Sequence, residues 1–351
     1  MINLKLVSCP SGHSDRMGMG HMRVLVTGGA GYIGSHMVHE LLDAGEKVVV
    51  LDNLSTGFRW AAPPAATLVV GDAGDQDLVR VLLRKHGVSA IIHFAGSIIV
   101  PESVTDPLGY YHNNTVKSRA LIEVAVATGV KHFIFSSTAA VYGNPQENPV
   151  AETAALAPMS PYGSSKLMTE IMLADAGRAY GLGWVVLRYF NVAGADPKGR
   201  TGQSTPKATH LIKVACETAL GKRPLLEVFG TDYPTADGTC VRDYIHVTDL
   251  VRAHSAALRH LRAGGGSDIF NCGYSKGYSV LEVIDAVKRV SGVDFQVRLS
   301  PRRPGDPSAI VAGSEKIRAS LGWRPEHDNL DEIVAQALAW ESRLAAFELA
   351  G

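Results

Sequence analysis

The sequence predicts an α/β protein in which a doubly wound parallel sheet precedes a smaller C-terminal α/β domain. Short runs rich in Val, Ile and Leu alternate with helix-length segments from Arg23 onward, a pattern typical of parallel strands covered by helices on both faces. A glycine-rich turn joins the first such run to the first helix. The 351 residues, 46% of them hydrophobic and 19% charged, provide enough core for roughly two domains of about 150 residues each.

The first half of the chain alternates regularly between strands and helices. We expect strands at 23–27, 47–51, 67–70, 90–94, 132–136 and 184–188. We expect helices at 33–44, 78–86, 108–128 and 161–180. Because each strand is apolar along most of its length, both faces of the sheet should be buried.

The second half of the chain, from Asn191, is more varied and is expected to form the smaller domain. We expect loops at 194–209 and 231–239 and a strand at 225–229. We expect helices at 211–220, 248–261, 279–290 and 331–347. Residues 1–22 contain Gly and Pro but no apolar stretch of signal-peptide length, so they are expected to be a disordered extension outside the fold.

Charge and cysteine content exclude several classes of protein. The 34 basic residues balance 34 acidic ones, so the chain has no basic excess with which to bind nucleic acid. No apolar run approaches the roughly 18 residues that cross a bilayer, so no membrane partner is expected. The cysteines form no CxxC pair, which predicts no metal site and a cytoplasmic protein with reduced thiols. They are Cys9, Cys216, Cys240 and Cys272.

The glycine-rich turn predicts a dinucleotide site. Gly29-Ala30-Gly31-Tyr32-Ile33-Gly34 matches GxGxxG and lies between the first strand and the first helix. Glycines there let the backbone approach a pyrophosphate, and the helix N-terminus offers it free N–H groups. Asp52, at the end of the second strand, would accept the adenosine ribose hydroxyls and repel a 2′-phosphate, which favours NAD over NADP. Asp72 and Phe94-Ala95-Gly96 also follow strands, where ligands bind in open α/β sheets.

A tyrosine and a lysine predict acid–base chemistry beside that cofactor. Tyr162 and Lys166 are four residues apart on the expected helix 161–180, so their side chains share one face. The ammonium is expected to lower the pKa of Tyr162, which supplies a base for an alcohol that loses a hydride. The hydroxyls of Ser136, Ser137 and Thr138 end a strand upstream and are expected to orient the substrate hydroxyl.

In this order the motifs resemble those of the extended short-chain dehydrogenase/reductases, and longer segments resemble the UDP-glucose 4-epimerase family within them. The resemblance runs from about Met22 to the C-terminus. It is carried by segments such as His93-Phe94-Ala95-Gly96, Tyr110-Tyr111-His112-Asn113-Asn114, Ala140-Val141-Tyr142-Gly143, Leu187-Arg188-Tyr189-Phe190-Asn191 and Val241-Arg242-Asp243-Tyr244-Ile245-His246.

The resemblance implies a cycle on tightly held NAD. Tyr162 would take the proton of the sugar 4-hydroxyl, Thr138 would bond to the same oxygen, and Lys166 would also hold the nicotinamide ribose. Hydride would leave C4, the 4-keto sugar would turn over, and hydride and proton would return. The sequence departs from the family at Thr138, where Ser is common, and at Ile98, where the best-known members carry a lysine that contacts a cofactor phosphate.

The resemblance also implies the binding residues. For NAD they are Gly28, Gly31, Tyr32, Ile33, Gly34, Asp52, Asn53, Asp72, Ala73, Phe94, Ala95, Gly96, Asn113, Ser136, Tyr162, Lys166, Tyr189 and Phe190. For the UDP-sugar they are Thr138, Tyr162, Asn191, His210, Phe229, Arg242, Arg303, Asp306 and Ile310. Ile310 occupies the position that gates the sugar pocket. Its intermediate size predicts UDP-galactose and UDP-glucose as the main pair, with weak activity on N-acetyl sugars.

The domain boundaries and the assembly are expected to follow the same family. Residues 23–190 would bind NAD, with 239–270 packing back onto this domain. Residues 191–238 and 271–351 would bind the UDP-sugar. A homodimer would form through the helices 108–128 and 161–180.

Two other readings of the sequence compete with the 4-epimerase. Dehydratases and decarboxylases of this fold need carboxylates beside the hydroxyl residue, but Ala139 and Ala140 follow Thr138 here. A non-catalytic NAD-sensing module would usually lack the pair Tyr162 and Lys166, which this chain retains. Both observations favour the epimerase.

Overall fold

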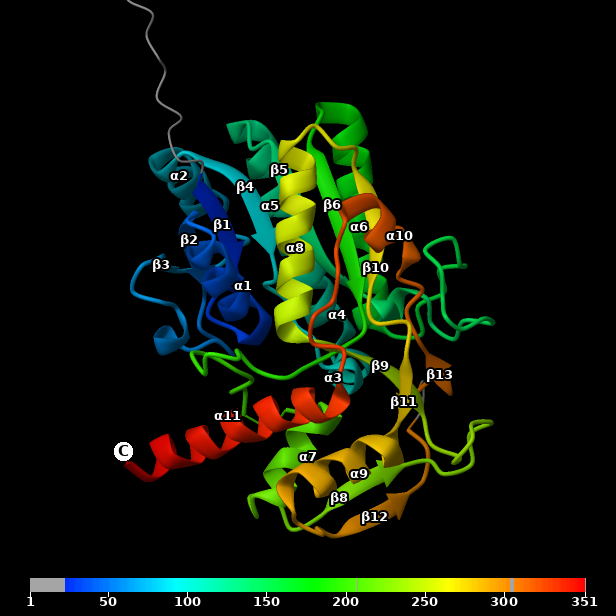
Figure 1. Cartoon of the computed structure of the whole chain (residues 1–351). Coiled ribbons are helices and arrows are strands. Elements are labelled where there is room, and N and C mark those ends of the chain that lie inside the picture. Colours follow the sequence, from blue (N-terminus) through cyan, green and yellow to red (C-terminus); the bar gives the residue numbers. More distant parts are fainter. Residues whose placement is uncertain (1–22, 207, 304–305, 351) are drawn as a thin grey trace, which may run out of the picture.

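The computed structural model describes residues 23–206, 208–303 and 306–350, without the side chains of 345–350 (Figure 1). The expectation for residues 1–22 lies outside these described residues. A parallel sheet in the order β10-β6-β5-β4-β1-β2-β3 confirms the doubly wound α/β fold. Its strands are β1 (Arg23–Thr27), β2 (Lys47–Asp52), β3 (Thr67–Val70), β4 (Val88–His93), β5 (His132–Thr138), β6 (Gly183–Tyr189) and β10 (Asp268–Cys272).

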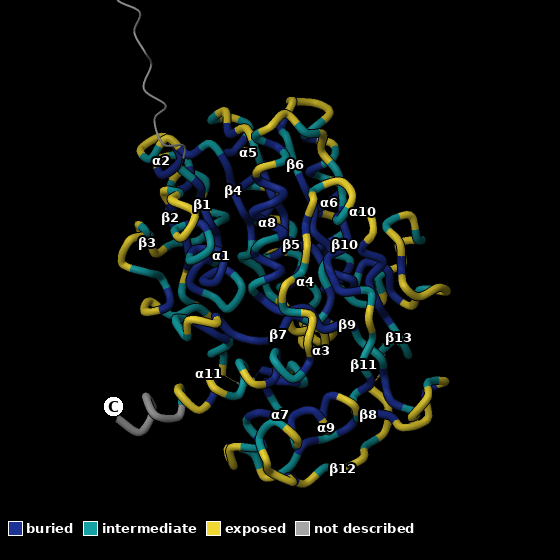
Figure 2. Tube along the Cα trace, in the orientation of Figure 1, coloured by how far each residue is buried: buried dark blue, intermediate teal, exposed yellow. Residues whose placement is uncertain are grey.

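Helices cover both faces of this sheet (Figure 1). One face packs against α1 (Tyr32–Asp43) and α8 (Val247–Arg262), and the other packs against α2 (Gln76–His86), α5 (Lys117–Thr128) and α6 (Pro161–Tyr180). Side chains alternate between the faces, since Val24 and Val26 join the first core and Leu25 joins the second. Both cores are buried, as Figure 2 shows.

The helix expected at 108–128 is divided in the structure. It begins as α4 (Pro107–Tyr110), continues through a π-helical segment at Tyr111–Val116 and ends as α5. Within the π segment, the carbonyl of Asn114 accepts hydrogen bonds from the Ser118 hydroxyl at 2.5 Å and from the Thr169 hydroxyl at 3.2 Å. These side chains compete with the regular helical ladder, and such π segments are frequent at functional sites.

The second half of the chain forms smaller sheets beneath the carboxyl edge of the large one (Figure 1). A small sheet contains β7 (Asn191–Ala193), β9 (Val241–His246), β11 (Gly277–Ser279) and β13 (Ala309–Ile310), and β8 (Leu226–Phe229) pairs with β12 (Val297–Ser300). The helices here are α7 (Leu211–Ala219), α9 (Val280–Ser291), α10 (Glu315–Leu321) and α11 (Leu330–Ala350). The expected strand at 225–229 and the four expected helices are confirmed, whereas the strands of the small sheet were not predicted.

The remaining short elements connect these layers. They are a 3₁₀ turn at Arg59–Ala61, α3 (Val100–Thr105) and a 3₁₀ turn at Ala139–Val141. Across the described ranges, no helix has both the length and the apolar character that crossing a membrane requires.

Candidate active site

The glycine-rich turn lies where the sheet changes direction. β1 pairs with β2 on one side and with β4 on the other, so the turn after β1 opens at this switch point, where open α/β sheets bind ligands. Gly28 has a φ of 69°, and a Cβ there would lie 2.8 Å from the backbone nitrogen of Ala95. The turn and the Phe94-Ala95-Gly96 segment therefore touch through their backbones. This cradle suits a pyrophosphate at the N-terminus of α1.

Asp52 holds the cradle in place from the end of β2. Its buried carboxylate accepts hydrogen bonds from the backbone N–H groups of Ala30 at 2.9 Å and Leu54 at 2.8 Å. Two carboxylate oxygens provide about four acceptor sites, so capacity remains for ribose hydroxyls. The side chain of the neighbouring Asn53 accepts a bond from Ser55 and thus stabilises the loop.

Asp72 is also held by partners within the protein. Lys117 bonds to its carboxylate at 2.5 Å, and the Gly74 N–H donates to it at 2.8 Å. Burial raises the pKa of Asp72, but these two hydrogen bonds outweigh burial and bring the pKa below its usual value. The carboxylate therefore stays charged and oriented at the end of β3, next to Ala73.

The structure brings Tyr162, Lys166 and Thr138 together. Thr138 lies at the carboxyl end of β5, and the other two lie in the first turns of α6. Ser160 caps α6 by accepting from the Gly163 N–H at 3.2 Å, which places Tyr162 and Lys166 at the start of the helix. Tyr162 is 8% exposed and its phenol interacts with the Thr138 hydroxyl. The Lys166 ammonium donates to the carbonyl of Ser136 at 3.1 Å. A phenol, a hydroxyl and an ammonium thus share one buried site.

Burial is the largest cause of the pKa shifts of both Tyr162 and Lys166. Burial raises the pKa of Tyr162, the hydrogen bond with Thr138 opposes this shift, and Lys166 is not among the causes. Burial lowers the pKa of Lys166 itself to about 8, against the raising effect of Glu170. In the protein by itself, burial therefore sets the direction of the Tyr162 pKa shift. The lowering of this pKa by Lys166 beside the positively charged nicotinamide of bound NAD stays a prediction.

Of the three hydroxyls at the end of β5, only Thr138 faces Tyr162. The Ser136 hydroxyl pairs with the buried His254 at 3.0 Å, and the Ser137 hydroxyl donates to the buried Glu170. The expectation that all three orient a substrate hydroxyl is wrong, because two of them satisfy buried groups of the core. The ring centroids of His254, on α8, and Phe94 lie 4.8 Å apart. The sequence contained no signal that His254 would pair with Ser136 beside this ring.

Three further residues expected around the cofactor lie on the π segment, at the end of β6 and directly after it. Asn113 donates to the Ser97 hydroxyl at 2.9 Å, which ties the π segment to the loop after β4. Burial raises the pKa of Tyr189, so this phenol stays neutral beside Tyr162. Phe190 packs in a core cluster that also contains Ile310.

Part of the expected UDP site gathers around Asp306. The guanidinium of Arg303 bonds to Asp306 at 3.0 Å, and that of Arg242 lies 4.0 Å from the other carboxylate oxygen. Arg303 also covers the Phe229 ring, with its Cζ 4.6 Å from the centroid. Two cations and an aromatic ring thus meet: Phe229 on β8, Arg242 on β9 and Arg303. This combination suits a pyrophosphate and a base.

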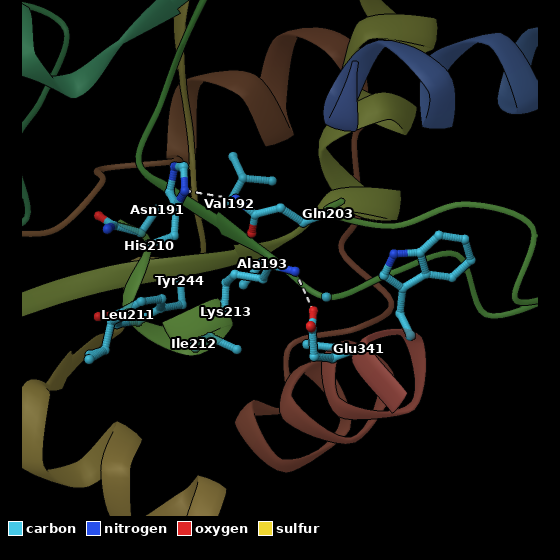
Figure 3. Close-up of a pocket in the computed structure, with 13 residues that line it drawn as sticks. Asn191, Val192, Ala193, Gln203, His210, Leu211, Ile212, Lys213, Tyr244 and Glu341 are labelled. Atoms are coloured by element: carbon cyan, nitrogen blue, oxygen red, sulfur yellow. Dashed lines mark hydrogen bonds and ion pairs between the residues drawn. The ribbon is translucent and has the colours of Figure 1, made fainter. Parts of the chain in front are cut away.

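Asn191 and His210 line a separate pocket (Figure 3). Gln203 bonds to the His210 ring at 2.8 Å, and burial lowers the pKa of His210, so the ring is neutral. Lys213 and Glu341 form a buried ion pair at the other end of this pocket. Sequence reasoning missed Gln203, Lys213 and Glu341, because only the fold brings α7, α11 and the 194–209 loop together.

Ile310 is buried on β13. It is 6% exposed, its Cα is paired with that of Arg242 on β9, and it packs in a cluster with Ala139 and Phe190. Ala139 follows Thr138 directly, so Ile310 shares its core cluster with the residue next to Thr138. No group of three or more potential metal ligands occurs among the residues that the structure describes.

A dinucleotide cradle at the switch point, together with a Tyr-x-x-x-Lys helix beside it, defines a protein of the short-chain dehydrogenase/reductase class. The chain belongs to the NAD dependent epimerase/dehydratase family, whose model matches residues 24–273. It is 59% identical to the UDP-glucose 4-epimerase of Azospirillum brasilense over 92% of both chains. The fold class predicted from the sequence is thereby confirmed.

Solved structures show the same fold. The UDP-glucose 4-epimerase of Brucella ovis, solved in complex with NAD, superposes with a TM-score of 0.88 at 44% identity and covers 91% of this chain and 98% of its own. The UDP-Glc/GlcNAc 4-epimerase of Campylobacter jejuni gives a TM-score of 0.81 at 50% identity, over 92% of this chain and 99% of its own. The likeness therefore extends through both halves of the chain.

Proposed function

We propose that this protein interconverts UDP-galactose and UDP-glucose with NAD as a resident cofactor. The observation that carries the proposal is the buried Tyr162, Thr138 and Lys166 group beside the glycine cradle, in a chain 59% identical to a UDP-glucose 4-epimerase. The cradle itself fits a dinucleotide, because a side chain at Gly28 would collide with the backbone of Phe94 and Ala95, and one at Gly34 would collide with the glycine turn. The Asp52 carboxylate favours NAD, since it would repel a 2′-phosphate.

Tyr162 is the proposed general base and acid. When bound, NAD supplies the hydride acceptor for sugar C4 and later the hydride donor. As the phenolate, Tyr162 would take the proton of the 4-hydroxyl and become the phenol, and the phenol would later return that proton. The Thr138 hydroxyl would bond to the same sugar oxygen as the charge on that oxygen changes. The Lys166 ammonium supplies positive charge beside the developing phenolate.

The second half of the chain would hold the UDP group while the sugar turns. Arg242 and Arg303 offer guanidinium groups to the pyrophosphate, Asp306 orients both of them, and Phe229 provides a face for uracil. In this proposal Asn191 and His210 would contact the UDP-sugar from the pocket that they line. Because the nucleotide stays bound, the 4-keto sugar can present its other face without leaving the protein.

The proposed substrate range follows from Ile310. Isoleucine is smaller than the aromatic residues that exclude N-acetyl groups and larger than the small residues that admit them. We therefore propose secondary, weaker activity on UDP-GlcNAc and UDP-GalNAc. The Campylobacter jejuni relative is described as a UDP-Glc/GlcNAc 4-epimerase.

The proposed assembly is a homodimer through the surface of α4, α5 and α6. Four large apolar side chains along these helices and the π segment are 43% exposed or more: Leu108, Val116, Met168 and Ile171. Apolar surface of this kind favours association with a second copy. Sedimentation at micromolar concentration would test the dimer. The proposed location is the cytoplasm, where the buried free thiols of Cys216, Cys240 and Cys272 would stay reduced.

A product assay without added cofactor tests the function. The purified protein is incubated with UDP-galactose, and UDP-glucose is measured together with absorbance at the wavelength of reduced nicotinamide. Many turnovers with no accumulation of free NADH support an epimerase. Release of NADH in proportion to the substrate consumed would instead indicate a dehydrogenase, and binding of NAD without any product would indicate a sensing module.

A further inference from the structure

A fully buried ion pair joins β6 to α6 directly beneath the proposed active site. The side chains of Arg188 and Glu170 are each 2% exposed and lie 2.6 Å apart between Arg188 Nη2 and Glu170 Oε2. Arg188 Nε adds bonds of 3.1 and 3.2 Å to the two carboxylate oxygens. The pair is therefore bidentate and completely removed from water.

The same pair reaches both elements that carry catalytic groups. On α6, Glu170 follows Lys166 by four residues, so the two lie on one face of the helix. On the sheet, Arg188 is the parallel partner of Ser137 on β5, and the Ser137 hydroxyl donates to Glu170. Thr138 is the next residue after Ser137. The ion pair thus links the strand end that holds Thr138 to the helix that holds Tyr162 and Lys166.

The third guanidinium nitrogen of Arg188, Nη1, also has a hydrogen-bond partner. Nη1 donates to the Tyr142 hydroxyl at 3.0 Å, and this hydroxyl donates to the Asn271 side chain at 2.6 Å. The guanidinium carbon lies 5.0 Å from the Tyr142 ring centroid. Each guanidinium nitrogen of Arg188 thus has a partner, and this fixes the geometry of the network, because a displaced group would leave a buried charge unpaired.

Stability alone does not explain a buried ion pair. Desolvation of two charges is expensive, and apolar residues of similar volume are often as stable or more stable in the same place. The placement between β5, β6 and α6 instead favours a role in the reaction. That role is electrostatic as well as geometric, because Glu170 interacts with Lys166.

The titratable groups around Lys166 come from four elements. Glu170 on α6 and His93 on β4 interact with Lys166, and Tyr162 lies on the same helix. Tyr189 on β6 and His254 on α8 both bond to Ser136, whose carbonyl accepts from Lys166. Arg188 on β6 pairs with Glu170. Burial lowers the pKa of His93 to about 3 and that of His254 to about 4, so both rings are neutral. Burial raises the pKa of Tyr162 and of Tyr189, so both phenols are neutral. Glu170 is the negative charge in this set, and Arg188 offsets it.

We propose that the Glu170–Arg188 pair is a positioning device that holds Thr138 against α6 and places one negative charge beneath the Lys166 ammonium. Both residues are positioning residues, since they act through Thr138 and Lys166. This inference rests on the proposed epimerase function. Without Glu170, Lys166 would face an unpaired buried cation, so the ammonium would lose its proton at lower pH.

The test compares Glu170→Gln, Arg188→Met and the double variant Glu170→Gln/Arg188→Met with the wild type. The readouts are kcat and KM for UDP-galactose from pH 6 to 9, NAD content and unfolding temperature. Glu170→Gln should lower kcat at least about tenfold, less than the roughly 100- to 10,000-fold of a group that transfers the proton itself. It should also move the alkaline limb of the kcat–pH profile to lower pH. The double variant carries no unpaired buried charge but also lacks the Glu170 carboxylate, so its alkaline limb should lie between those of Glu170→Gln and the wild type while kcat stays reduced.

Glu46→Gln is the matched control. Glu46 pairs with Arg262 at 2.5 Å, with both side chains partly buried, and this pair lies before β2 and at the end of α8, away from the catalytic residues. The control should keep the wild-type pH profile. Any one of three results would overturn the inference. They are an alkaline limb that does not move in Glu170→Gln, an equal movement of that limb in the control, and a wild-type kcat in the double variant.

These outcomes differ from failure of the proposed function. If the wild type forms no UDP-glucose, the function itself is wrong. If the wild type turns over and Glu170→Gln equals it, only the positioning role is wrong. Should Glu170→Gln fail to fold, the charge-balanced double variant still decides, because a wild-type kcat there would contradict positioning.

Discussion

Gly34→Ala is a sharp test of the cofactor cradle because two opposite effects can be compared. Gly34 lies in the first turn of α1, where alanine gains roughly 1 kcal/mol of helix propensity over glycine. However, a Cβ at this position would lie only 2.0 Å from the carbonyl oxygen of Gly28 and 2.7 Å from its carbonyl carbon. Cβ atoms essentially never lie closer than 3.0 Å to another heavy atom, so the helix or the turn must move.

The required movement sets the expected magnitude. The 2.0 Å contact must open to at least 3.0 Å, a shift of about 1 Å, and such overpacking typically costs about 1–3 kcal/mol. Since the helix gains roughly 1 kcal/mol, the net loss of unfolding free energy should be small, about 0–2 kcal/mol. The N-terminus of α1 would nevertheless move away from the turn, and NAD affinity should fall at least about tenfold, or about 1.4 kcal/mol.

The assay is NAD retained per chain after gel filtration, measured together with the unfolding temperature. Gly266→Ala serves as the control, because a Cβ there would meet no atom within 4 Å. We expect Gly266→Ala to retain NAD like the wild type and Gly34→Ala to lose most of it while remaining folded. Wild-type NAD content in Gly34→Ala would refute the reasoning, since it would show that the turn tolerates a displaced helix.

Four further predictions concern the chemistry and the pH range. Tyr162→Phe should lower turnover at least about 100-fold with NAD still bound, because only the proton-carrying oxygen is lost, and near-normal turnover would contradict the mechanism. Thr138→Val should lower kcat roughly ten- to a thousandfold without loss of NAD, whereas Thr138→Ser should stay close to the wild type; a large defect in the serine variant would indicate a packing role. Ile310→Ser should raise activity on UDP-GlcNAc and Ile310→Tyr should remove it; equal activity in all three proteins would show that residue 310 does not contact the sugar. Burial lowers the pKa of His254 from 6.5 to about 4, so the unfolded chain binds more protons between these values, and stability should fall as the pH drops below 6.5. At pH 5 this amounts to about 2 kcal/mol from this residue, and His254→Gln should reduce the difference in urea midpoint between pH 7.5 and pH 5; an unchanged difference would contradict the shift.

Local patterns were sufficient for the elements that have a regular period and a clear cap. The strand of β1, the glycine turn and α1 follow one another as predicted, and α6 spans Pro161–Tyr180 as its Ser160 cap and Pro161 indicate. The short strands β9 and β13 were missed. β9 carries Arg242 and Asp243, and β13 has two residues, so neither has an apolar pattern of its own. Their pairing depends on partners distant in the sequence.

The sequence by itself determined the α/β class, the cofactor cradle and the Tyr162, Lys166 and Thr138 group. These features are local. Glycine spacing, helix periodicity and strand ends each depend on residues within about 30 positions of one another, the length of a single βαβ unit.

Only the tertiary structure decided which neighbours complete the site. The sequence could not show that Ser137 faces Glu170, that Arg188 lies opposite Ser137, or that burial raises the pKa of Tyr162 in the protein by itself. The physical reason is that desolvation and hydrogen-bond partners depend on contacts between α6, β5 and β6, and only packing brings these elements together.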